Sequence, residues 1–208
     1  LMAIYARDAG VWKNVSGGAP CPECPECPEC PECPTIENAN FTNGPTGTYT
    51  FGADSYKYVK FTGSSGTLTV TVEGIADILA VGPGQTTSGL GNGGVVAYSS
   101  IIIPVGSYQV AIGASETSQG AGNSSPTRLG NVIGAGRGIG SSNLGNGGFN
   151  PSSNGVVIDI TGTSREYGAG GGRKASLPNP EDQYGIGGDS AISNRAGSGV
   201  VIVRVRTN

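Results

Sequence analysis

The sequence predicts an all-β protein with a β-sandwich-like domain at its C-terminal end. Short runs of β-branched and aromatic residues recur from about residue 47 onward, separated by glycine, serine, asparagine or aspartate. Such spacing is typical of a sandwich or a small barrel. No segment shows the 3.6-residue periodicity of an amphipathic helix. Glycine makes up 38 of the 208 residues, and it buries little surface, so we expect long glycine-rich loops and a core that gains stability from neighbouring chains.

The first element is predicted to be a short hairpin within residues 1–16. The segment alternates around an Asp-Ala-Gly turn at residues 8–10. So short a hairpin is not stable alone, and its large apolar side chains are expected to pack on a partner. We therefore interpret it as a docking element for a larger particle, with contacts from Ile4, Tyr5 and Trp12.

Residues 17–35 are predicted to form an extended rod. The stretch 20–34 reads PCPECPECPECPECP, and a proline at every third position excludes helix and central strand. The remaining conformation is polyproline II, in which a three-residue repeat aligns like side chains along one edge. The aligned side chains are all the cysteines of the chain: Cys21, Cys24, Cys27, Cys30 and Cys33.

The aligned thiols indicate several parallel chains rather than single-chain chemistry. A stiff line of thiols cannot wrap a zinc ion tetrahedrally, and a proline-rich segment lacks the helix N-terminus that activates a redox thiol. Parallel copies would bring thiols together at every level. Staggered interchain disulfides, packed free thiols, a bound metal and a plain spacer all remain open, and we favour a homotrimeric stalk.

The domain at 36–208 is predicted to contain strands at 48–52, 56–63, 67–74 and 76–82, with two or three more in 93–113. The alternation in 67–74 places Leu68, Val70 and Val72 on one face, and we expect all three in the core. Residues 114–198 are rich in glycine and contain only short apolar islands. The chain then closes with a strong predicted strand, SGVVIVRVR, so the glycine-rich region is expected to be enclosed within the fold.

Four ordered stretches resemble the glycine-rich C-terminal domain of tailed-phage fibre and tail-tip proteins. They read ADILAVGPG, IPVGSYQVAIGA, VVIDITGTSREYGAGGG and GSGVVIVRV, within about residues 76–205. The N-terminal IYARDAGVWKNV is similar to a segment that opens many such virion proteins. The resemblance implies a virion component outside the capsid, extracellular after host lysis, with partners among the other virion proteins and a host-surface receptor, possibly a glycan. A capsid-mounted decoration protein or head fibre, a polysaccharide depolymerase and a non-viral surface protein remain alternatives.

Enzymatic activity is not expected. The chain has no histidine, which excludes serine–histidine and cysteine–histidine pairs. No spacing singles out a glycosidase pair among the carboxylates. The run Val132–Gly140 imitates a phosphate loop, but the residues after it cannot form the helix that such a loop needs, so no cofactor is expected.

Binding to nucleic acid and insertion into a membrane are not expected either. The net charge is −3 without a basic stripe, and no apolar run approaches a membrane span. Tyrosine and arginine in 163–196 are instead the predicted receptor contacts, because they give much contact energy at low entropic cost. The tyrosines Tyr98 and Tyr108 are assigned to packing. The predicted contact residues are Arg165, Tyr167, Arg173, Lys174, Tyr184 and Arg195.

Overall fold

The computed structural model describes the chain as two compact units, Leu1–Thr35 and Ile36–Asn208. The residues described are 5–8, 11–14, 36–63, 65–85, 92–114, 125–136, 154–170, 184–187 and 196–208. All regular structure among these residues is β, without a helix.

The first unit contains a two-stranded antiparallel hairpin. Strand β1 (Tyr5–Asp8) pairs with β2 (Val11–Asn14), and Trp12 lies opposite Arg7. A hairpin in this segment was predicted from the sequence, and its two strands pair up to Asp8 and Val11. Ile4 and the cysteine tract lie outside the described residues, as do the side chains of the hairpin, so docking through Ile4, Tyr5 and Trp12 stays a prediction.

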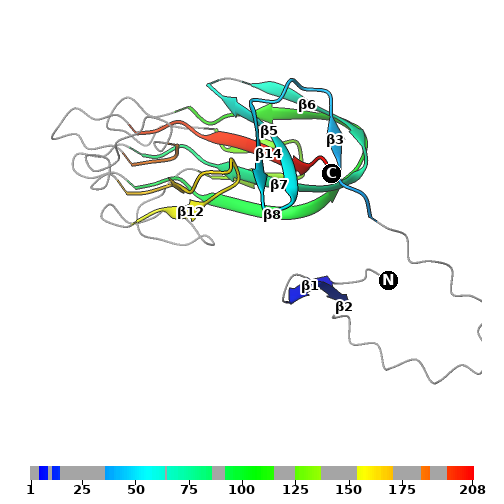
Figure 1. Cartoon of the computed structure of the whole chain (residues 1–208). Helices are drawn as coiled ribbons and strands as arrows, with labels where there is room; N and C mark the ends of the chain where they lie inside the picture. The colour runs from blue at the N-terminus through cyan, green and yellow to red at the C-terminus, as the bar shows by residue number, and fades with distance from the viewer. Residues whose placement is uncertain are drawn as a thin grey trace, which may run out of the picture. The chain divides into compact units, whose positions relative to one another are not determined.

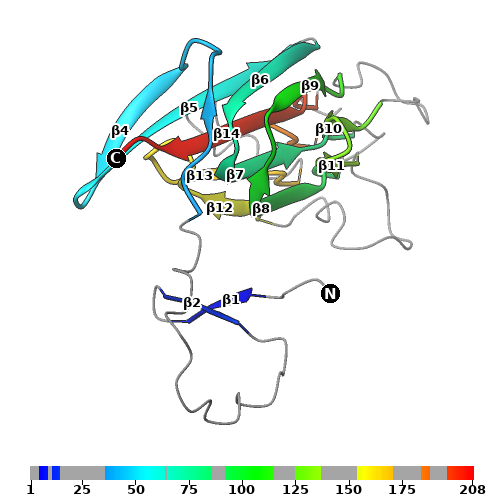
Figure 2. The ribbon, with the colours of Figure 1, turned by 90° about the vertical axis from the view of Figure 1, so that its right-hand side faces the viewer.

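The second unit is built from two five-stranded antiparallel sheets (Figures 1 and 2). We name the first the β14 sheet. Its strands, in spatial order, are β4 (Gly47–Phe51), β5 (Asp54–Thr62), β14 (Val200–Arg206), β7 (Gly74–Val81) and β8 (Val96–Ile103).

We name the second the β9 sheet. Its strands, in spatial order, are β11 (Ile133–Ala135), β10 (Thr127–Leu129), β9 (Gly106–Ala111), β6 (Gly66–Val72) and β3 (Asn40–Phe41). The glycine-rich residues 114–198 therefore contribute the short strands β10 and β11, where the sequence alone indicated mainly loops.

The last strand in the sequence occupies the middle of the β14 sheet. β14 pairs with β5 from Val200↔Thr62 to Arg206↔Tyr56, and with β7 from Val200↔Val81 to Arg204↔Asp77. The sheet is consequently complete only when the C-terminal segment has joined it. Along the sequence, the glycine-rich region thus lies between strands of the same unit.

The main core lies between the two sheets. One face of β14 contributes Val201, Val203 and Val205, which pack with residues of the β9 sheet such as Leu68 and Val110. All five side chains are almost completely buried. Residues 201, 203 and 205 are two positions apart, so their side chains lie on one face of β14, the face toward the other sheet.

The prediction for β6 is correct at two positions and wrong at the third. Leu68 and Val70 are buried, with 0% and 3% of their surface exposed, but Val72 is 39% exposed. Val72 is the last residue of β6 and lies opposite Asn40 of the two-residue strand β3. The sheets no longer cover each other there, and Val72 lines an open hollow instead.

A second, smaller core covers the other face of the β14 sheet. A two-stranded hairpin, β12 (Val156–Ile158) with β13 (Arg165–Tyr167), lies on that face, away from β6 and β9 (Figure 2). Ile160 and Tyr167 pack there against Leu79, Val200 and Ile202. Because both faces are covered, β7 and β14 carry continuous apolar runs in place of an alternation.

Candidate functional site

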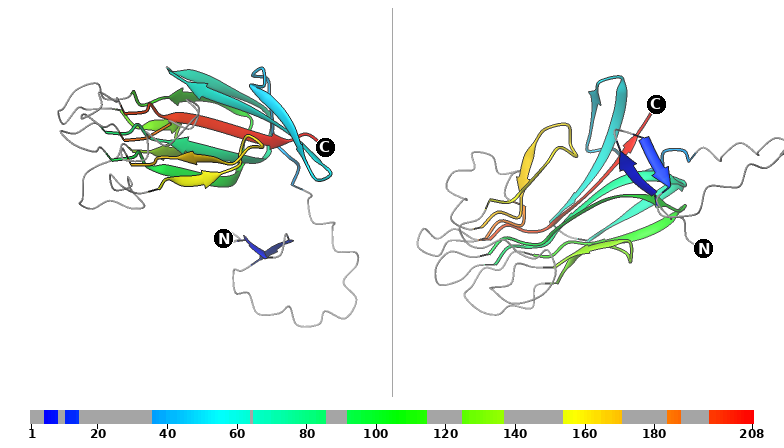
Figure 3. Two further views of the ribbon diagram at one scale, coloured as in Figure 1. Left: turned by 60° about the vertical axis from the view of Figure 1, so that its left-hand side comes forward. Right: turned by 90° about the horizontal axis from the view of Figure 1, so that it is seen from below.

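Extended glycine-rich segments meet at one end of the second unit, beyond the strands of the β14 sheet (Figure 3). Each segment continues or precedes a strand: 82–85 follows β7, 92–95 precedes β8, and 196–199 precedes β14. We call these segments the glycine layer, together with the following: 168–170, 184–187, Gly113 and Gly136.

Backbone hydrogen bonds join the segments in three dimensions. The amide of Gly94 donates to the carbonyl of Gly185 at 2.5 Å, and Gly168 donates to Tyr184 at 3.1 Å. Gly197 donates to Ile186 at 2.8 Å. Segment 184–187 is thus bonded to three neighbouring segments, whereas a strand in a flat sheet has two. The layer is therefore a bundle of backbones and not an extension of one sheet.

Only glycine fits these contacts. A Cβ atom on Gly82 would lie 1.7 Å from the carbonyl oxygen of Gly136, and one on Gly93 would lie 1.7 Å from that of Gly168. A Cβ atom on Gly84 would lie 1.9 Å from the carbonyl oxygen of Ile186. Close approach of backbones is one of the uses of glycine that its missing Cβ allows. The high glycine content is thus partly structural.

Five connecting stretches of the sequence begin and end at or beside this layer. They are 86–91, 115–124, 137–153, 171–183 and 188–195, and they lie outside the described residues. The described residues that flank them are held in place: Gln85 donates its amide to the carbonyl of Asn92 at 2.9 Å, and Gly187 donates to Ala169 at 2.9 Å. One end of the unit therefore carries the bases of all five stretches.

The opposite end of the unit holds Ile36 and the C-terminal residues of the sequence. Asn38 forms a parallel bridge with Ile75, at the beginning of β7, while the glycine layer follows the end of β7. In Figure 1 the C-terminus lies beside β3. The second unit thus joins the rest of the chain at the end opposite to the glycine layer.

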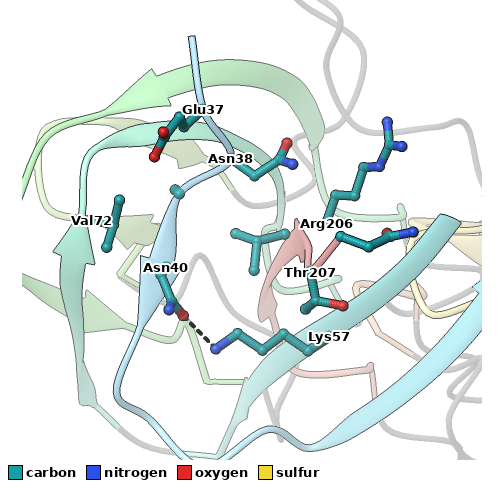
Figure 4. A pocket seen from close by; sticks show the side chains of 10 residues that line it. Glu37, Asn38, Asn40, Lys57, Val72, Arg206 and Thr207 are labelled. Carbon is teal, nitrogen blue, oxygen red and sulfur yellow. Dashed lines mark hydrogen bonds between the residues drawn. The ribbon is translucent and has the colours of Figure 1, made fainter. Parts of the chain in front are cut away.

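An open hollow of about 600 Å³ lies at this opposite end (Figure 4). Lys57 donates from Nζ to Asn40 Oδ1 at 2.5 Å and to the carbonyl of Phe41 at 3.2 Å. Burial lowers the pKa of Lys57 below its ordinary value. The lining residues are Glu37, Asn38, Ala39, Asn40, Lys57, Val72, Val205, Arg206, Thr207 and Asn208. They offer no set of convergent ligand groups, so this hollow is a weaker candidate.

A polar network lies on the outer face of the β14 sheet, where the hairpin β12–β13 meets it. Arg204 donates from Nε to Asp77 Oδ2 at 2.8 Å and from Nη1 to the hydroxyl of Tyr49 at 2.6 Å. Its Nη2 donates to the hydroxyl of Tyr98 at 3.3 Å. Burial lowers the pKa of Arg204, but the carboxylate of Asp77 outweighs this and holds the pKa above its ordinary value. The donors are satisfied within the protein, which indicates a structural role.

The structure places the predicted contact residues in different environments. Tyr167 is 1% exposed and packs in the second core, so the prediction that it reaches a receptor is wrong. Its position in β13, with its side chain on the covered face, is the physical reason. Arg165 and Tyr184 are half-buried, and Tyr184 packs beside the second core. Arg173, Lys174 and Arg195 lie within the connecting stretches, outside the described residues.

The two tyrosines assigned to packing differ from each other. Tyr108 packs against the main core and donates its hydroxyl to the carbonyl of Pro104 at 2.7 Å. Tyr98 is 45% exposed on β8, although its hydroxyl belongs to the Arg204 network. The glycine layer itself was not predicted. Its signal in the sequence is that each of the four quoted stretches carries glycine next to a strand.

No metal-binding group of three or more acidic or cysteine side chains occurs within the described parts of the chain. Nor do the described residues form a helix long and apolar enough to cross a bilayer. Comparisons with protein-family models, with curated proteins and with solved structures find no match to this chain.

Proposed function

We propose that this chain is a structural protein of a phage virion, a tail-fibre or tail-tip component that displays its glycine-rich domain for attachment to a host surface. The second unit has two functionally distinct ends. It joins the rest of the chain at the end that holds Ile36, and it carries the bases of five connecting stretches at the other.

The observation that carries this proposal is the convergence of the four resembling stretches. ADILAVGPG forms β7 and enters the glycine layer through Gly82 and Gly84. GSGVVIVRV leaves the layer and forms β14. The remaining two stretches contribute Gly113 and Gly168, which are bonded to the same layer. Segments far apart in sequence thus build one base from which the five connecting stretches depart, and a framework that carries loops is a common arrangement in binding proteins.

The mechanism that follows is multivalent attachment. Several copies on one particle convert weak contacts of single domains into a strong overall association. The stalk at 17–35 would hold the copies in parallel, with the five aligned cysteines facing one another between chains. The receptor contacts that remain from the sequence prediction are Arg165, Arg173, Lys174, Tyr184 and Arg195.

Binding of the full-length chain, immobilised at high density on beads, to host cells tests the proposal. We expect binding, and we expect the triple variant Arg173→Ala, Lys174→Ala, Arg195→Ala to weaken it at least tenfold. A matched control is Arg206→Ala, which removes a cation at the opposite end of the unit and should leave binding unchanged. Absence of binding at high bead density would reject the attachment function and favour a purely architectural role in the particle.

A further inference from the structure

The β14 sheet has two long edge strands that no described strand covers. The outer strands of the two five-stranded sheets are β11, β3, β4 and β8. β11 and β3 have three and two residues, whereas β4 and β8 have five and eight. An edge strand presents unpaired backbone donors and acceptors, which makes it a template for another strand.

Neither long edge carries the features that usually prevent pairing. The strands β4 (GTYTF) and β8 (VAYSSIII) contain no charged residue and no proline. The charged residues of this sheet all lie on its three inner strands, for instance Lys57 on β5, Asp77 on β7 and Arg204 on β14. Natural proteins usually place charges on free edges to block association. In this sheet the charged residues lie on the inner strands and not on the edges, which indicates that the edge strands pair with another strand.

Large apolar side chains are exposed on both edges. Phe51 at the end of β4 is 72% exposed, and Ile102 near the end of β8 is 49% exposed. Val105, two residues after the end of β8, is 62% exposed. Across the sheet, Ile102 is level with Tyr49, and Phe51 is level with the residues directly after β8. On one side of the sheet, Ile102 pairs with Ile75. Asp77 pairs with Arg204, so Ile75, two residues before Asp77, is level with Arg206. On the other side, Arg206 pairs with Tyr56, and Tyr56 pairs with Tyr49.

We infer that β8 of one copy pairs with β4 of a second copy of this chain, so that the β14 sheets join into a closed ring. The inference rests on the proposed function, in which the stalk at 17–35 holds the copies in parallel, and on the homotrimer that the cysteine tract favours; all copies then point the same way. The rotation axis then runs along the strands. Strands β4 and β14 run in the same direction, because both are antiparallel to β5. Strands β14 and β8 also run in the same direction, because both are antiparallel to β7.

This geometry makes the contact parallel and heterologous. A rotation along the strand axis brings Tyr49 and Phe51 of the partner level with Ile102 and the residues after β8. Contacts between two different patches close into rings when the rotation permits, as a trimer does. An isologous pairing of β8 with β8 across a perpendicular twofold axis would instead point the glycine layers to opposite ends.

The test is the molar mass of the full-length chain in solution, measured by light scattering with a thiol reductant present to remove any contribution from interchain disulfides. We expect three chains for the unaltered protein. Ile102→Lys and Phe51→Lys should each give single chains, because either change places a charge in every contact. Val157→Lys is the matched control: Val157 is 64% exposed on β12, outside both edges, and should keep three chains. Circular dichroism and thermal unfolding check that each variant is folded.

Mixing distinguishes the heterologous contact from other arrangements. Ile102→Lys retains an intact β4, and Phe51→Lys retains an intact β8, so an equimolar mixture should form a two-chain species and nothing larger. Single chains for the unaltered protein, or an unchanged mass in both variants, would overturn the inference. An effect of Ile102→Lys without an effect of Phe51→Lys would overturn it as well, because that pattern indicates β8 pairing with β8.

Host-cell binding on beads separates this inference from the proposed function. Beads supply multivalency without the ring, so Ile102→Lys should bind as the unaltered chain does. If Ile102→Lys loses the trimer but still binds host cells on beads, the result supports both the ring and the attachment function. A trimer that fails to bind host cells would reject the attachment function and leave the ring in place.

Discussion

Glycine residues in the second unit act chiefly by letting backbones touch. Gly93 shows this most clearly, since a Cβ atom there would lie 1.7 Å from the carbonyl oxygen of Gly168 and 2.7 Å from that of Ala169. Both neighbours are backbone atoms, which cannot rotate away. The glycine layer therefore depends on individual glycines and not on glycine content in general.

We predict that Gly93→Ala lowers the free energy of unfolding by about 2–3 kcal/mol, because the methyl group forces two hydrogen-bonded segments apart. The measurement is urea denaturation followed by circular dichroism. Gly44→Ala is the control, since a Cβ atom at Gly44 meets no atom within 4 Å, and a change within about 0.5 kcal/mol is expected there. Equal stability of the two variants would contradict the assigned role of the layer.

The tyrosines around Arg204 predict sensitivity to alkaline pH. Burial raises the pKa of Tyr49 above 10.0, although the hydrogen bond from Arg204 partly opposes this, and burial with the charge of Asp77 raises that of Tyr98. The folded state thus prefers the neutral phenols. Their contribution to stability is present below about pH 10 and is lost as the pH rises through their folded pKa values.

The expected result is a free energy of unfolding that falls between pH 9 and pH 11, with a smaller fall in the double variant Tyr49→Phe, Tyr98→Phe. Lys57 acts in the opposite direction over this range, because burial lowers its pKa and the folded state gains as the amine loses its proton. Lys57→Gln removes that opposing contribution. An identical pH slope in the double variant and the unaltered chain would refute this assignment.

At the scale of elements, the hairpin β12–β13 is attached to the β14 sheet through a small number of defined contacts. The turn after β12 lies against the ring of Tyr49, which stacks on Tyr56 with 5.2 Å between ring centroids. Arg204 donates a hydrogen bond to the hydroxyl of Tyr49. The stretch 137–153 ends beside β12 and the stretch 171–183 begins beside β13, so the position of this hairpin sets one base of each stretch.

We predict that Arg204→Gln costs about 1.5–3 kcal/mol of stability, the range for hydrogen bonds to charged groups, because it leaves the half-buried carboxylate of Asp77 without its cationic partner. Arg206→Gln is the matched control on the same strand. Its ion pair with Asp54 is more exposed, and a loss within about 1 kcal/mol is expected. Urea denaturation of both variants gives the comparison, and a larger loss for Arg206→Gln would contradict it.

We also predict that Gly162→Ala loosens this attachment. Gly162 has a φ of 80°, in the left-handed region, and a Cβ atom there would lie 2.5 Å from the ring of Tyr49. Backbone strain and the clash together are expected to cost about 1–3 kcal/mol. Hydrogen exchange should then accelerate in 154–167 and stay unchanged in β6 and β9. Uniform acceleration through the unit would instead indicate global destabilisation.

At the scale of the whole molecule, the second unit contains both cores. Residues of the main core and of the second core all lie between 39 and 205. The unit closes on itself, since its final strand completes a sheet that begins at residue 47. Such a unit is expected to fold without the residues that precede it.

We predict that a fragment of residues 36–208 unfolds cooperatively, with the same urea midpoint and slope as the second unit in the full-length chain. The slope reports the surface exposed on unfolding, so an equal slope means that the fragment retains the whole core. Removal of β14 by ending the chain at residue 199 is the contrasting variant and should abolish folding. A fragment that is folded without β14 would contradict the central position of that strand.

Periodicity along the chain was sufficient to predict the all-β class and several strands. Alternation in TLTVTV and the apolar run in VVIVRVR each follow from local side-chain chemistry, and both segments form strands. The partial failure at Val72 is also local in origin. Alternation assigns a face to a residue, but whether the opposite sheet covers that residue depends on how far the strands of the β14 sheet extend, and those strands come from other parts of the sequence.

The sequence by itself determined the chemistry: an all-β chain without histidine, with glycine beside its strands and cysteines confined to one proline-rich tract. The tertiary structure alone decided which glycines meet, that Tyr167 is buried, and that Arg204 joins Asp77 to Tyr49. The physical reason is distance along the chain. Contacts such as Arg204 to Asp77, 127 residues apart, arise only when β14 enters the middle of its sheet, and no local pattern encodes that position.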